Sequence, residues 1–470
     1  MSKKIEFGTD GWRGVIAEDF TYDNVRLVAQ AISDHINYFH KKERKIVVVG
    51  YDTRFMSKNY AKLIAEVITA NGIKAIFSKE FIPTPALSLA AKKRSTAGGI
   101  MVTASHNPAN FNGIKYKTNL GTSAGLEITK SIESFLGKHP IKKIDYSLAV
   151  KKKLIKEIDL SKEYLKHIKK FVDFSLINKS KFNVLIDAMH GTADSLMKGL
   201  LEKSNIKMSF INNEPRCDFN GIKPEPIENN LGELKRLLKK GKFAVGLATD
   251  GDSDRVGAMT ESGRFINSSQ IFSLLLLYFI DKKNMKISIG KTVSCSSLIN
   301  KISDAYKIKI YETPIGFKYL ADLIIENKIS FACEESGGIG LAKYLPERDG
   351  ILAELLILEM LSAYKKSLGE IMRDVENKFG KFYYQRVDIK YPAHKREEIM
   401  HNVSPLKVKK IDGSKIKHVQ ETDGLKYLSE DGSWLLFRFS GTEPILRIYA
   451  ESDSAAKTTK IIKSAVRRVT

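Results

Sequence analysis

The chain repeats one pattern that limits its fold: a short apolar strand, a turn, and then a helix. Residues 45–50 (KIVVVG) form a run rich in β-branched side chains, as in a strand buried on both faces. Apolar residues then recur at helical spacing from Ala61 to Ile68, Asn71-Gly72 supplies a stop, and a strand returns at 73–77. This βαβ order predicts a largely parallel sheet and an α/β fold.

The same pattern occurs twice more. Residues 183–187 (NVLID) and 291–295 (KTVSC) are apolar strands that enter helical segments, although the letters show no literal repeat. The end of the chain differs, since strands at 434–439 and 445–450 precede a helix that starts at Ala455. We therefore expect three similar mixed α/β domains and a smaller α+β domain that begins near Lys381.

A chain of 470 residues is long enough for about three or four domains. We expect boundaries that give domains at 1–150, 151–256, 257–380 and 381–470. Residues 151–170 hold eight lysines against three acids and predict an exposed connecting helix.

The 77 basic and 54 acidic residues give a net charge of +23. Such an excess is typical of proteins that bind phosphates, nucleic acid or anionic surfaces, but a lysine-rich composition spread over the surface would give it too.

Three cysteines at distant positions exclude a disulfide framework and a cysteine zinc module, and fit a reducing compartment. The N-terminus has no apolar signal core, and the longest apolar stretch (271–280) is too short to span a membrane and predicts a buried helix. We expect a cytoplasmic protein without a membrane partner.

An acidic loop follows the strand at 244–248. Asp250, Asp252 and Asp254 alternate along it and would repel one another without a cation, and hard oxygen ligands indicate Mg²⁺ or Ca²⁺. An EF-hand fails because Arg255 stands where that loop needs glycine and because a strand precedes it. A nucleophile motif of the haloacid-dehalogenase type is another possibility, but that motif does not call for a third Asp followed by Arg, as at Asp254-Arg255. A plain acidic turn without a metal is the remaining alternative.

A second cluster surrounds Ser105 in the segment TASHNP (103–108). A hydroxyl beside His106, with Lys115 close behind, suits a nucleophilic or phosphate-accepting serine. A phosphorylated serine gains about −1.5 to −2 charges and would need a cation such as the one at the acidic loop. Alone, His106 would more often be a turn or core residue.

Two further loops suit a phosphorylated sugar. RFSGTEP (438–444), followed by Arg447, combines arginines, hydroxyls and backbone N–H groups that can surround a phosphate, although such a loop could also be a simple turn. CEESGG (333–338) offers acids and a hydroxyl for sugar hydroxyls. Gly290-Lys291-Thr292 lacks the leading glycine of a P-loop, and no G-x-G-x-x-G opens a βα turn, so ATP and NAD binding have no support.

In this order, these loops resemble those of the α-D-phosphohexomutases, the phosphoglucomutase and phosphomannomutase family. FGTDGWRG (7–14) resembles the family's opening segment, and the four loops resemble its phosphoserine, magnesium, sugar-recognition and phosphate-binding loops. The resemblance covers the whole chain. It implies four domains around a central cleft, with three sharing one α/β topology.

The resemblance also implies roles for individual residues. Ser105 would be the phosphoserine, and Asp250, Asp252 and Asp254 would bind Mg²⁺ together with a phosphoryl oxygen of Ser105. Arg13, Arg255 and Lys115 would stabilise the transferring charge, with Lys115 as proton shuttle and His106 as a further catalytic residue. The expected substrate-binding residues are Arg255, Thr313, Gly316, Phe317, Lys318, Glu334, Ser336, Arg348, Arg438, Ser440, Gly441, Thr442 and Arg447.

The implied reaction passes the phosphoryl group from phosphoserine to a hexose phosphate. This step gives a 1,6-bisphosphate that turns over and returns its other phosphate to Ser105, with glucose 1,6-bisphosphate as activator. The segment TPIGFK (313–318) resembles the specificity loop of phosphoglucomutases, so glucose is the favoured sugar. A dual-specificity phosphomannomutase is the alternative, and a phosphoglucosamine mutase is less favoured because those enzymes usually have Asp-Arg after that glycine.

Several positions depart from the family pattern. They are Cys333 for Gly, Phe439 for Pro, Arg348 for Lys, and Gly338 without the Gly-His ending of dual-specificity enzymes. A noncatalytic anion or nucleic-acid binder would show damage in the catalytic set, whereas every member is present. We therefore expect a phosphosugar substrate, no nucleic acid, and a monomer or homodimer.

Overall fold

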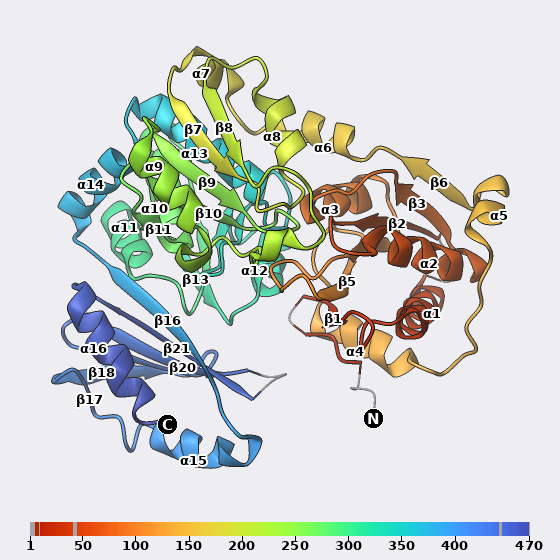
Figure 1. The fold of residues 1–470 in the computed structure, drawn as a ribbon. Coiled ribbons are helices and arrows are strands. Elements are labelled where there is room, and N and C mark those ends of the chain that lie inside the picture. The colour runs from red at the N-terminus through yellow and green to blue at the C-terminus, as the bar shows by residue number, and fades with distance from the viewer. Residues whose placement is uncertain (1–4, 9, 41–44, 441–443, 470) are drawn as a thin grey trace.

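The computed structural model describes residues 5–8, 10–40, 45–440 and 444–469. Four sheets, each with its own helices, define four units along the chain (Figure 1). The first unit lies on the right of Figure 1, the second and third lie together at upper left, and the fourth lies below them. This is the expected arrangement of three mixed α/β units and a smaller C-terminal α+β unit.

The first unit has a six-stranded mixed sheet. Its strands, in spatial order, are β1 (Trp12–Val15), β5 (Phe111–Lys117), β4 (Gly98–Val102), β2 (Ile46–Tyr51), β3 (Lys74–Ser78) and β6 (Ile155–Ile158). Strands β4, β2, β3 and β6 are parallel, as the βαβ pattern predicts, and β1 and β5 add antiparallel pairs. The helices are α1 (Tyr22–Phe39), α2 (Ser57–Ala70), α3 (Thr84–Lys93), α4 (Leu126–Phe135) and α5 (Tyr146–Lys151).

The segment 151–170 is not the connecting helix expected from its charge. It contains β6, which pairs with β3, and the separate helix α6 (Ser161–Ile168). Ile155 is buried in the first core while Lys156 and Glu157 are exposed. The charged residues belong to a short edge strand, and they obscure its apolar pattern in the sequence. The first sheet therefore extends past the boundary expected at residue 150.

The second unit has the strand order β11 (Phe265–Ile266), β10 (Val256–Thr260), β9 (Val245–Thr249), β7 (Asn183–Asp187) and β8 (Lys207–Ile211). Its helices are α7 (Phe174–Lys179), α8 (Asp194–Leu201) and α9 (Gly232–Lys240), with short 3₁₀ helices η1 (Phe219–Gly221) and η2 (Glu228–Asn230). Strands β10 and β11 complete this sheet beyond the expected boundary at 256, because they form antiparallel pairs outward from β9.

The third unit has the strand order β13 (Ile310–Thr313), β12 (Ile289–Thr292), β14 (Phe331–Cys333) and β15 (Ile339–Leu341). Its helices are α10 (Ser268–Asp281), α11 (Leu298–Tyr306), α12 (Phe317–Ile325), α13 (Gly350–Tyr364) and α14 (Leu368–Phe379). Helix α10 contains the apolar stretch 271–280 and is buried, as expected. Helix α13 contacts β9 and β10, so the second and third units share one hydrophobic core.

The fourth unit is an antiparallel sheet with the strand order β16 (Tyr383–Lys390), β21 (Ile445–Ser452), β20 (Trp434–Phe439), β19 (Leu425–Ser429), β18 (Ser414–Gln420) and β17 (Lys410–Ile411). It also holds η3 (Ala393–Lys395), α15 (Arg396–Asn402) and α16 (Ala455–Val466), and α16 packs on β16 and β21 over a core of its own. Among all the helices described, none is long and apolar enough to cross a membrane.

Candidate active site

Ser105 lies in a tight turn directly after β4. Its side chain is fully buried and its backbone has a φ of 51°, a left-handed conformation that few non-glycine residues adopt. Its hydroxyl donates a hydrogen bond of 2.7 Å to Asp250 Oδ2 in the second unit. The turn therefore aims the serine hydroxyl at the acidic loop.

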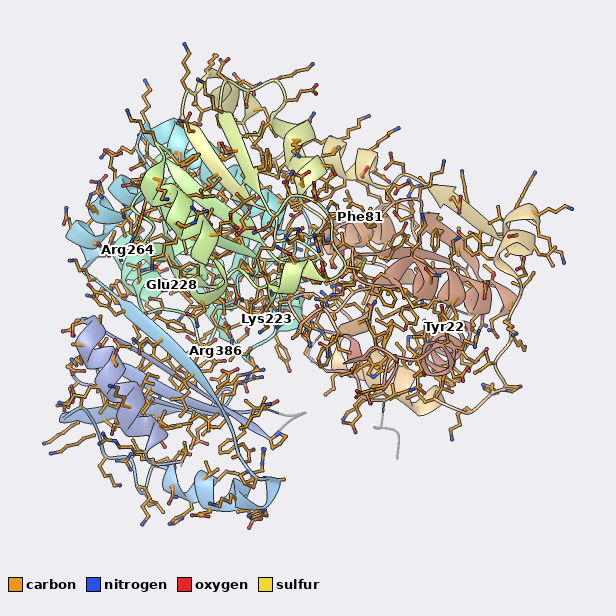
Figure 2. All side chains as sticks on the ribbon, in the orientation of Figure 1. Tyr22, Phe81, Lys223, Glu228, Arg264 and Arg386 are labelled. Atoms are coloured by element: carbon orange, nitrogen blue, oxygen red, sulfur yellow. The ribbon has the colours of Figure 1, made fainter. Side chains whose placement is uncertain are left out.

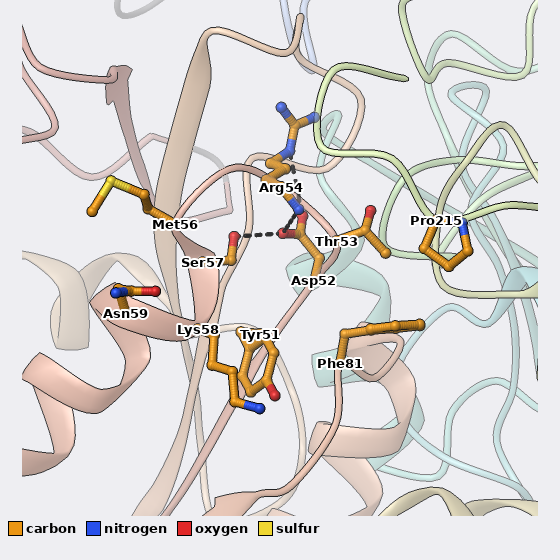
Figure 3. Close-up of a pocket in the computed structure, with 10 residues that line it drawn as sticks. All are labelled: Tyr51, Asp52, Thr53, Arg54, Met56, Ser57, Lys58, Asn59, Phe81 and Pro215. Carbon is orange, nitrogen blue, oxygen red and sulfur yellow. Dashed lines mark hydrogen bonds and ion pairs between the residues drawn. The ribbon is translucent and has the colours of Figure 1, made fainter. Parts of the chain in front are cut away.

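Arg54 holds this turn from behind. Its guanidinium donates hydrogen bonds of 2.6 to 3.0 Å to the backbone carbonyls of four residues: Ser105, Asn107, Pro108 and Phe111. Asp52 lies 3.3 Å from Arg54 Nε and also accepts from Ser57, beside a hollow of about 210 Å³ (Figure 3). Arg54 thus fixes the shape of the serine turn through backbone contacts alone.

The three aspartates of the acidic loop converge on one point. One oxygen of each lies within 4.8 Å of the others, and all three side chains are fully buried. Asp252 Oδ1 and Asp254 Oδ1 have no hydrogen-bond partner among the residues described. Burial, and then repulsion from Asp254 and Asp252, raises the pKa of Asp250 well above its usual value. Hard oxygen donors with unsatisfied lone pairs fit a Mg²⁺ ion, as the sequence predicts.

Lys115 of β5 lies among carboxylates. Its Nζ is 2.9 Å from Asp10, 2.8 Å from Asp252 and 3.0 Å from Asp254. Burial lowers the pKa of Lys115, but these three carboxylates outweigh burial and raise it above its ordinary value. In this arrangement Lys115 is an ammonium ion in contact with the acidic loop.

Arg348 joins three units at the same place. Its Nη1 donates to Glu334 of the third unit at 2.8 Å, and its Nη2 contacts Asp10 of the first unit at 2.8 Å and Asp254 of the second at 3.0 Å. A neighbouring pair, Lys117 and Glu347, links the first and third units at 2.6 Å. Buried charge pairs that link different units in this way fix the relative positions of the units.

Arg13, Arg255 and His106 complete the surroundings of the serine. Arg13 donates to Asn107 Oδ1 at 2.7 Å, and Arg255 Nε lies within 4 Å of Asp250 and Asp254. His106 Nδ1 is 3.5 Å from Ser105 Oγ. Burial, together with Arg255 and Arg13, holds the pKa of His106 well below its usual value, so this imidazole is neutral near pH 7.

The residues expected to recognise the sugar lie on the third unit. Burial raises the pKa of Glu334, while the attraction of Arg348 and the nearby hydroxyl of Ser336 oppose this. Thr313 ends β13, and Gly316, with a φ of 133°, precedes α12. The pKa of Lys318 is lowered by burial, while attraction to Asp322 and Asp10 opposes this.

Phe317 is an exception among the expected substrate contacts. Its side chain is 3% exposed and belongs to the hydrophobic cluster of α12 with Leu320, Ala321 and Ile324. Phe317 is the first residue of α12, and its spacing from Leu320, Ala321 and Ile324 places it on the buried face of that helix. The structure therefore assigns Phe317 to the core and not to a surface that faces substrate.

The fourth unit places two arginines side by side. Arg438 on β20 and Arg447 on β21 are direct cross-strand partners, so their side chains leave the same face of the sheet. Arg438 Nε pairs with Asp423 at 2.8 Å, and Arg447 Nε lies 3.6 Å from Asp388. Ser440 follows β20 and is 7% exposed, whereas Gly441 and Thr442 lie outside the described residues. Two arginines on one face of a sheet are the kind of donor set that binds a phosphate, as the sequence predicts here.

The expected residues therefore fall into three groups. The first surrounds Ser105 and the acidic loop, the second lies in the 313–318 loop of the third unit, and the third lies on the fourth unit. Within the described residues, no hydrogen bond or ion pair joins Arg438 or Arg447 to the first group. The second and fourth units do come close at Lys223, whose charge helps to lower the pKa of Asp388 beside Arg386, and the labels of Lys223 and Arg386 are neighbours in Figure 2.

Several functional residues were missed by sequence reasoning. Asp10, Asp52, Arg54 and Lys117 all support the centre, although only Asp10 lies in a segment that resembled the family. Asp52 and Arg54 directly follow β2, and the carboxyl end of a parallel strand is where functional loops gather. That position could have identified them.

Family comparisons match the chain in four consecutive segments. The description "Phosphoglucomutase/phosphomannomutase, alpha/beta/alpha domain I" matches residues 4–140, domain II matches 162–263, domain III matches 267–379, and the C-terminal domain matches 389–468.

Individual proteins agree over the full length. A probable phosphoglucosamine mutase of Methanosphaera stadtmanae is 30% identical across 97% of this chain and 96% of its own. A phosphoglucomutase/phosphomannomutase of Thermococcus kodakarensis is 29% identical across 98% and 97%. The crystal structure of a putative phosphomannomutase from Thermus thermophilus superposes with a TM-score of 0.87 at 31% identity, covering 99% of both chains. This chain therefore belongs to the phosphoglucomutase/phosphomannomutase family and is an intramolecular phosphotransferase.

Proposed function

We propose that this protein interconverts hexose 1-phosphate and hexose 6-phosphate, with glucose as the sugar, through a phosphoserine at Ser105 and a 1,6-bisphosphate intermediate. One observation carries the proposal: a buried serine hydroxyl bonds to Asp250, Lys115 and Arg255 lie against the same acidic loop, and Arg13 contacts Asn107 of the serine turn. A serine in this setting can hold a phosphoryl dianion and release it, because the cations offset its charge.

The reaction balances around Ser105 Oγ. Phosphoserine meets a hexose phosphate, the P–Oγ bond breaks as a bond forms from phosphorus to the free sugar hydroxyl, and the proton of that hydroxyl ends on Ser105 Oγ by way of the proposed shuttle Lys115. The bisphosphate then presents its other phosphate, and the same exchange runs in reverse. Arg438, Ser440 and Arg447, with Gly441 and Thr442, would hold the phosphate that is not transferring, while Glu334 and Ser336 bind sugar hydroxyls in either orientation.

Lys115 and His106 have different protonation states beside Ser105. Three carboxylates keep Lys115 protonated, so it stabilises charge in this arrangement and could accept a proton only after losing part of that attraction. His106 is neutral and lies 3.5 Å from Ser105 Oγ. The proton shuttle proposed for Lys115 therefore depends on Asp252 and Asp254 sharing their charge with a bound cation.

Asp250, Asp252 and Asp254 would hold the Mg²⁺ ion, with a phosphoryl oxygen of Ser105. When bound, this ion supplies charge neutralisation at the transferring phosphate. Crystal structures of Aspergillus fumigatus N-acetylphosphoglucosamine mutase that share the fold are described in complex with magnesium and GlcNAc-6P, and with glucose 1,6-bisphosphate. These complexes support glucose 1,6-bisphosphate as a ligand of the proposed site and a phosphosugar as its substrate.

The choice of sugar rests on the third unit. The TPIGFK loop (313–318) supports glucose. At residue 338, a Cβ would come within 2.7 Å of Arg348 Cδ, so the observed position of Arg348 requires glycine at 338. The relatives are named as mutases of glucose, mannose or glucosamine phosphates. The second candidate function is activity on both glucose and mannose phosphates, because the Thermococcus relative is named for both. The cytoplasmic location, the monomer or homodimer state and the absence of a nucleic-acid partner stay predictions.

The test is a coupled assay that converts glucose 1-phosphate to glucose 6-phosphate with Mg²⁺ and a trace of glucose 1,6-bisphosphate, with mannose 1-phosphate and glucosamine 1-phosphate run beside it. Ser105→Ala should reduce turnover by orders of magnitude, and intact-mass measurement should place one phosphoryl group on Ser105. Ser134→Ala, an exposed serine of α4, is the control. Turnover by Ser105→Ala near the wild-type rate would refute the phosphoserine.

A further inference from the structure

Asp423 connects the two halves of the proposed substrate site. It lies just before β19, and one of its oxygens, Oδ2, accepts two hydrogen bonds. The backbone N–H of Ile315, in the 313–318 loop of the third unit, donates one at 2.9 Å. Arg438 Nε of the fourth unit donates the other at 2.8 Å. A single carboxylate oxygen therefore ties the sugar-specificity loop to an arginine of the phosphate site.

The contact at Nε fixes how Arg438 is presented. A guanidinium is a planar fork, so a carboxylate on Nε sets its plane and the direction of Nη1 and Nη2. Arg447 is the direct cross-strand partner of Arg438, and like charges in that position repel. Asp423 offsets this repulsion from a largely buried position, since its side chain is 22% exposed and that of Arg438 is 14% exposed.

Among the described residues, further contacts between the third and fourth units do not involve Arg438. Glu451 of β21 accepts from the backbone N–H of Ser297 and from Trp434 Nε1, both at 2.8 Å. Lys426 Nζ donates to the carbonyl of Val293 at 2.6 Å. These contacts hold the third and fourth units together without Arg438. The bond between Asp423 and Arg438 is therefore not needed for that purpose alone.

We propose that Asp423 is a positioning residue that sets the phosphate-binding arginine Arg438 at a fixed place relative to the 313–318 loop. The inference rests on the proposed function, in which Arg438 holds the phosphate that is not transferring and the loop contacts the sugar. Because that phosphate is held in both orientations of the substrate, Asp423 acts on binding of hexose 1-phosphate and of hexose 6-phosphate alike.

The experiment compares Asp423→Ala and Asp423→Asn with Glu451→Gln, a carboxylate that also spans the two units but does not touch Arg438. For glucose 1-phosphate and glucose 6-phosphate, Asp423→Ala should raise KM about tenfold in both directions with a much smaller change in kcat, as expected for loss of a charge-assisted hydrogen bond. Asp423→Asn keeps one acceptor and should fall between. Glu451→Gln should lower the melting temperature and leave KM unchanged.

A double-mutant cycle tests whether Asp423 acts through Arg438. In an Arg438→Met background, Asp423→Ala should change KM by no more than about twofold. An unchanged KM in Asp423→Ala, or equal effects of Asp423→Ala and Glu451→Gln, would overturn the inference.

Calorimetric binding of glucose 6-phosphate separates this inference from the proposed function. If the wild type binds glucose 6-phosphate without turning it over, and Asp423→Ala binds it about tenfold more weakly, the mutase proposal fails and the role of Asp423 stands. If the wild type turns over normally and Asp423→Ala binds as tightly as the wild type, only the role of Asp423 fails. A wild type that binds no hexose phosphate would refute both.

Discussion

Ser105 Oγ and Asp250 Oδ2 are 2.7 Å apart although 145 positions separate the residues in the chain. The bond joins the turn after β4 in the first unit to the loop after β9 in the second. Since Asp250 also belongs to the converging aspartates, it both accepts the hydrogen bond of Ser105 and forms part of the proposed metal site.

Mg²⁺ should stabilise the wild-type protein through this carboxylate cluster. A ligand present at 100 times its Kd adds about 2.7 kcal/mol to the folded state, so the melting temperature should rise by several degrees. In Asp252→Asn the rise should be largely lost, because one of three charged ligands is removed. Asp218→Asn, an exposed acid of the same unit paired with Arg216, is the control and should keep it. Differential scanning fluorimetry gives the comparison, and a full Mg²⁺ response in Asp252→Asn would contradict the assignment.

Arg54 should control activity without touching substrate. Arg54→Lys keeps the charge but cannot reach four backbone carbonyls, so the serine turn should lose its shape, and turnover should fall by about 100-fold, the size expected for a displacement of about 1 Å. Lys58→Met, at the rim of the same hollow, should retain wild-type turnover. The coupled assay measures both, and a fully active Arg54→Lys would show that the turn holds its shape alone.

The sequence predicted this centre unevenly, for physical reasons. The acidic loop and the serine turn each carry their chemistry in consecutive residues, so local pattern was enough to identify them. Arg54 and Asp423 act on partners far along the chain, and nothing near them in the sequence reveals those partners. Strand β6 was missed because only one of its faces is apolar. Phe317 was expected to contact the substrate because a resemblance in sequence gives the position of a residue in the chain but not the direction of its side chain.

Arg348 should hold the first three units together. Arg348→Met leaves Asp10, Asp254 and Glu334 buried without their shared cation, which should cost about 3–5 kcal/mol and lower the melting temperature markedly. Added Mg²⁺ should recover part of the loss, since it offsets the charge of Asp254. Arg373→Met, an exposed arginine 3.6 Å from Glu261, should melt like the wild type. Equal melting temperatures for the two variants would show that the carboxylates find other partners.

Glu354 on α13 should make stability depend on pH. Both of its carboxylate oxygens are buried without a hydrogen-bond partner among the described residues. Burial, and then repulsion from Asp187 and Asp349, raises the pKa of Glu354 well above its ordinary value of 4.5. Between 4.5 and that raised pKa, the folded protein keeps a proton that the unfolded chain has released. The free energy of unfolding should therefore fall as the pH rises through this window.

Glu354→Gln should remove this dependence. Because one pKa unit corresponds to about 1.4 kcal/mol, the variant should gain melting temperature over the wild type with each step of pH from 6.5 up to the raised pKa of Glu354. Starting above pH 6 matters, since burial raises the pKa of both Asp187 and Asp349 to about 6 and their contribution has the same sign below that pH. Glu359→Gln is the control on the same helix, because Glu359 is equally buried but accepts hydrogen bonds from Tyr278 and from the backbone of Asp173. It should destabilise the protein at every pH, and a Glu354→Gln variant that tracks the wild type across the series would refute the buried, protonated carboxyl.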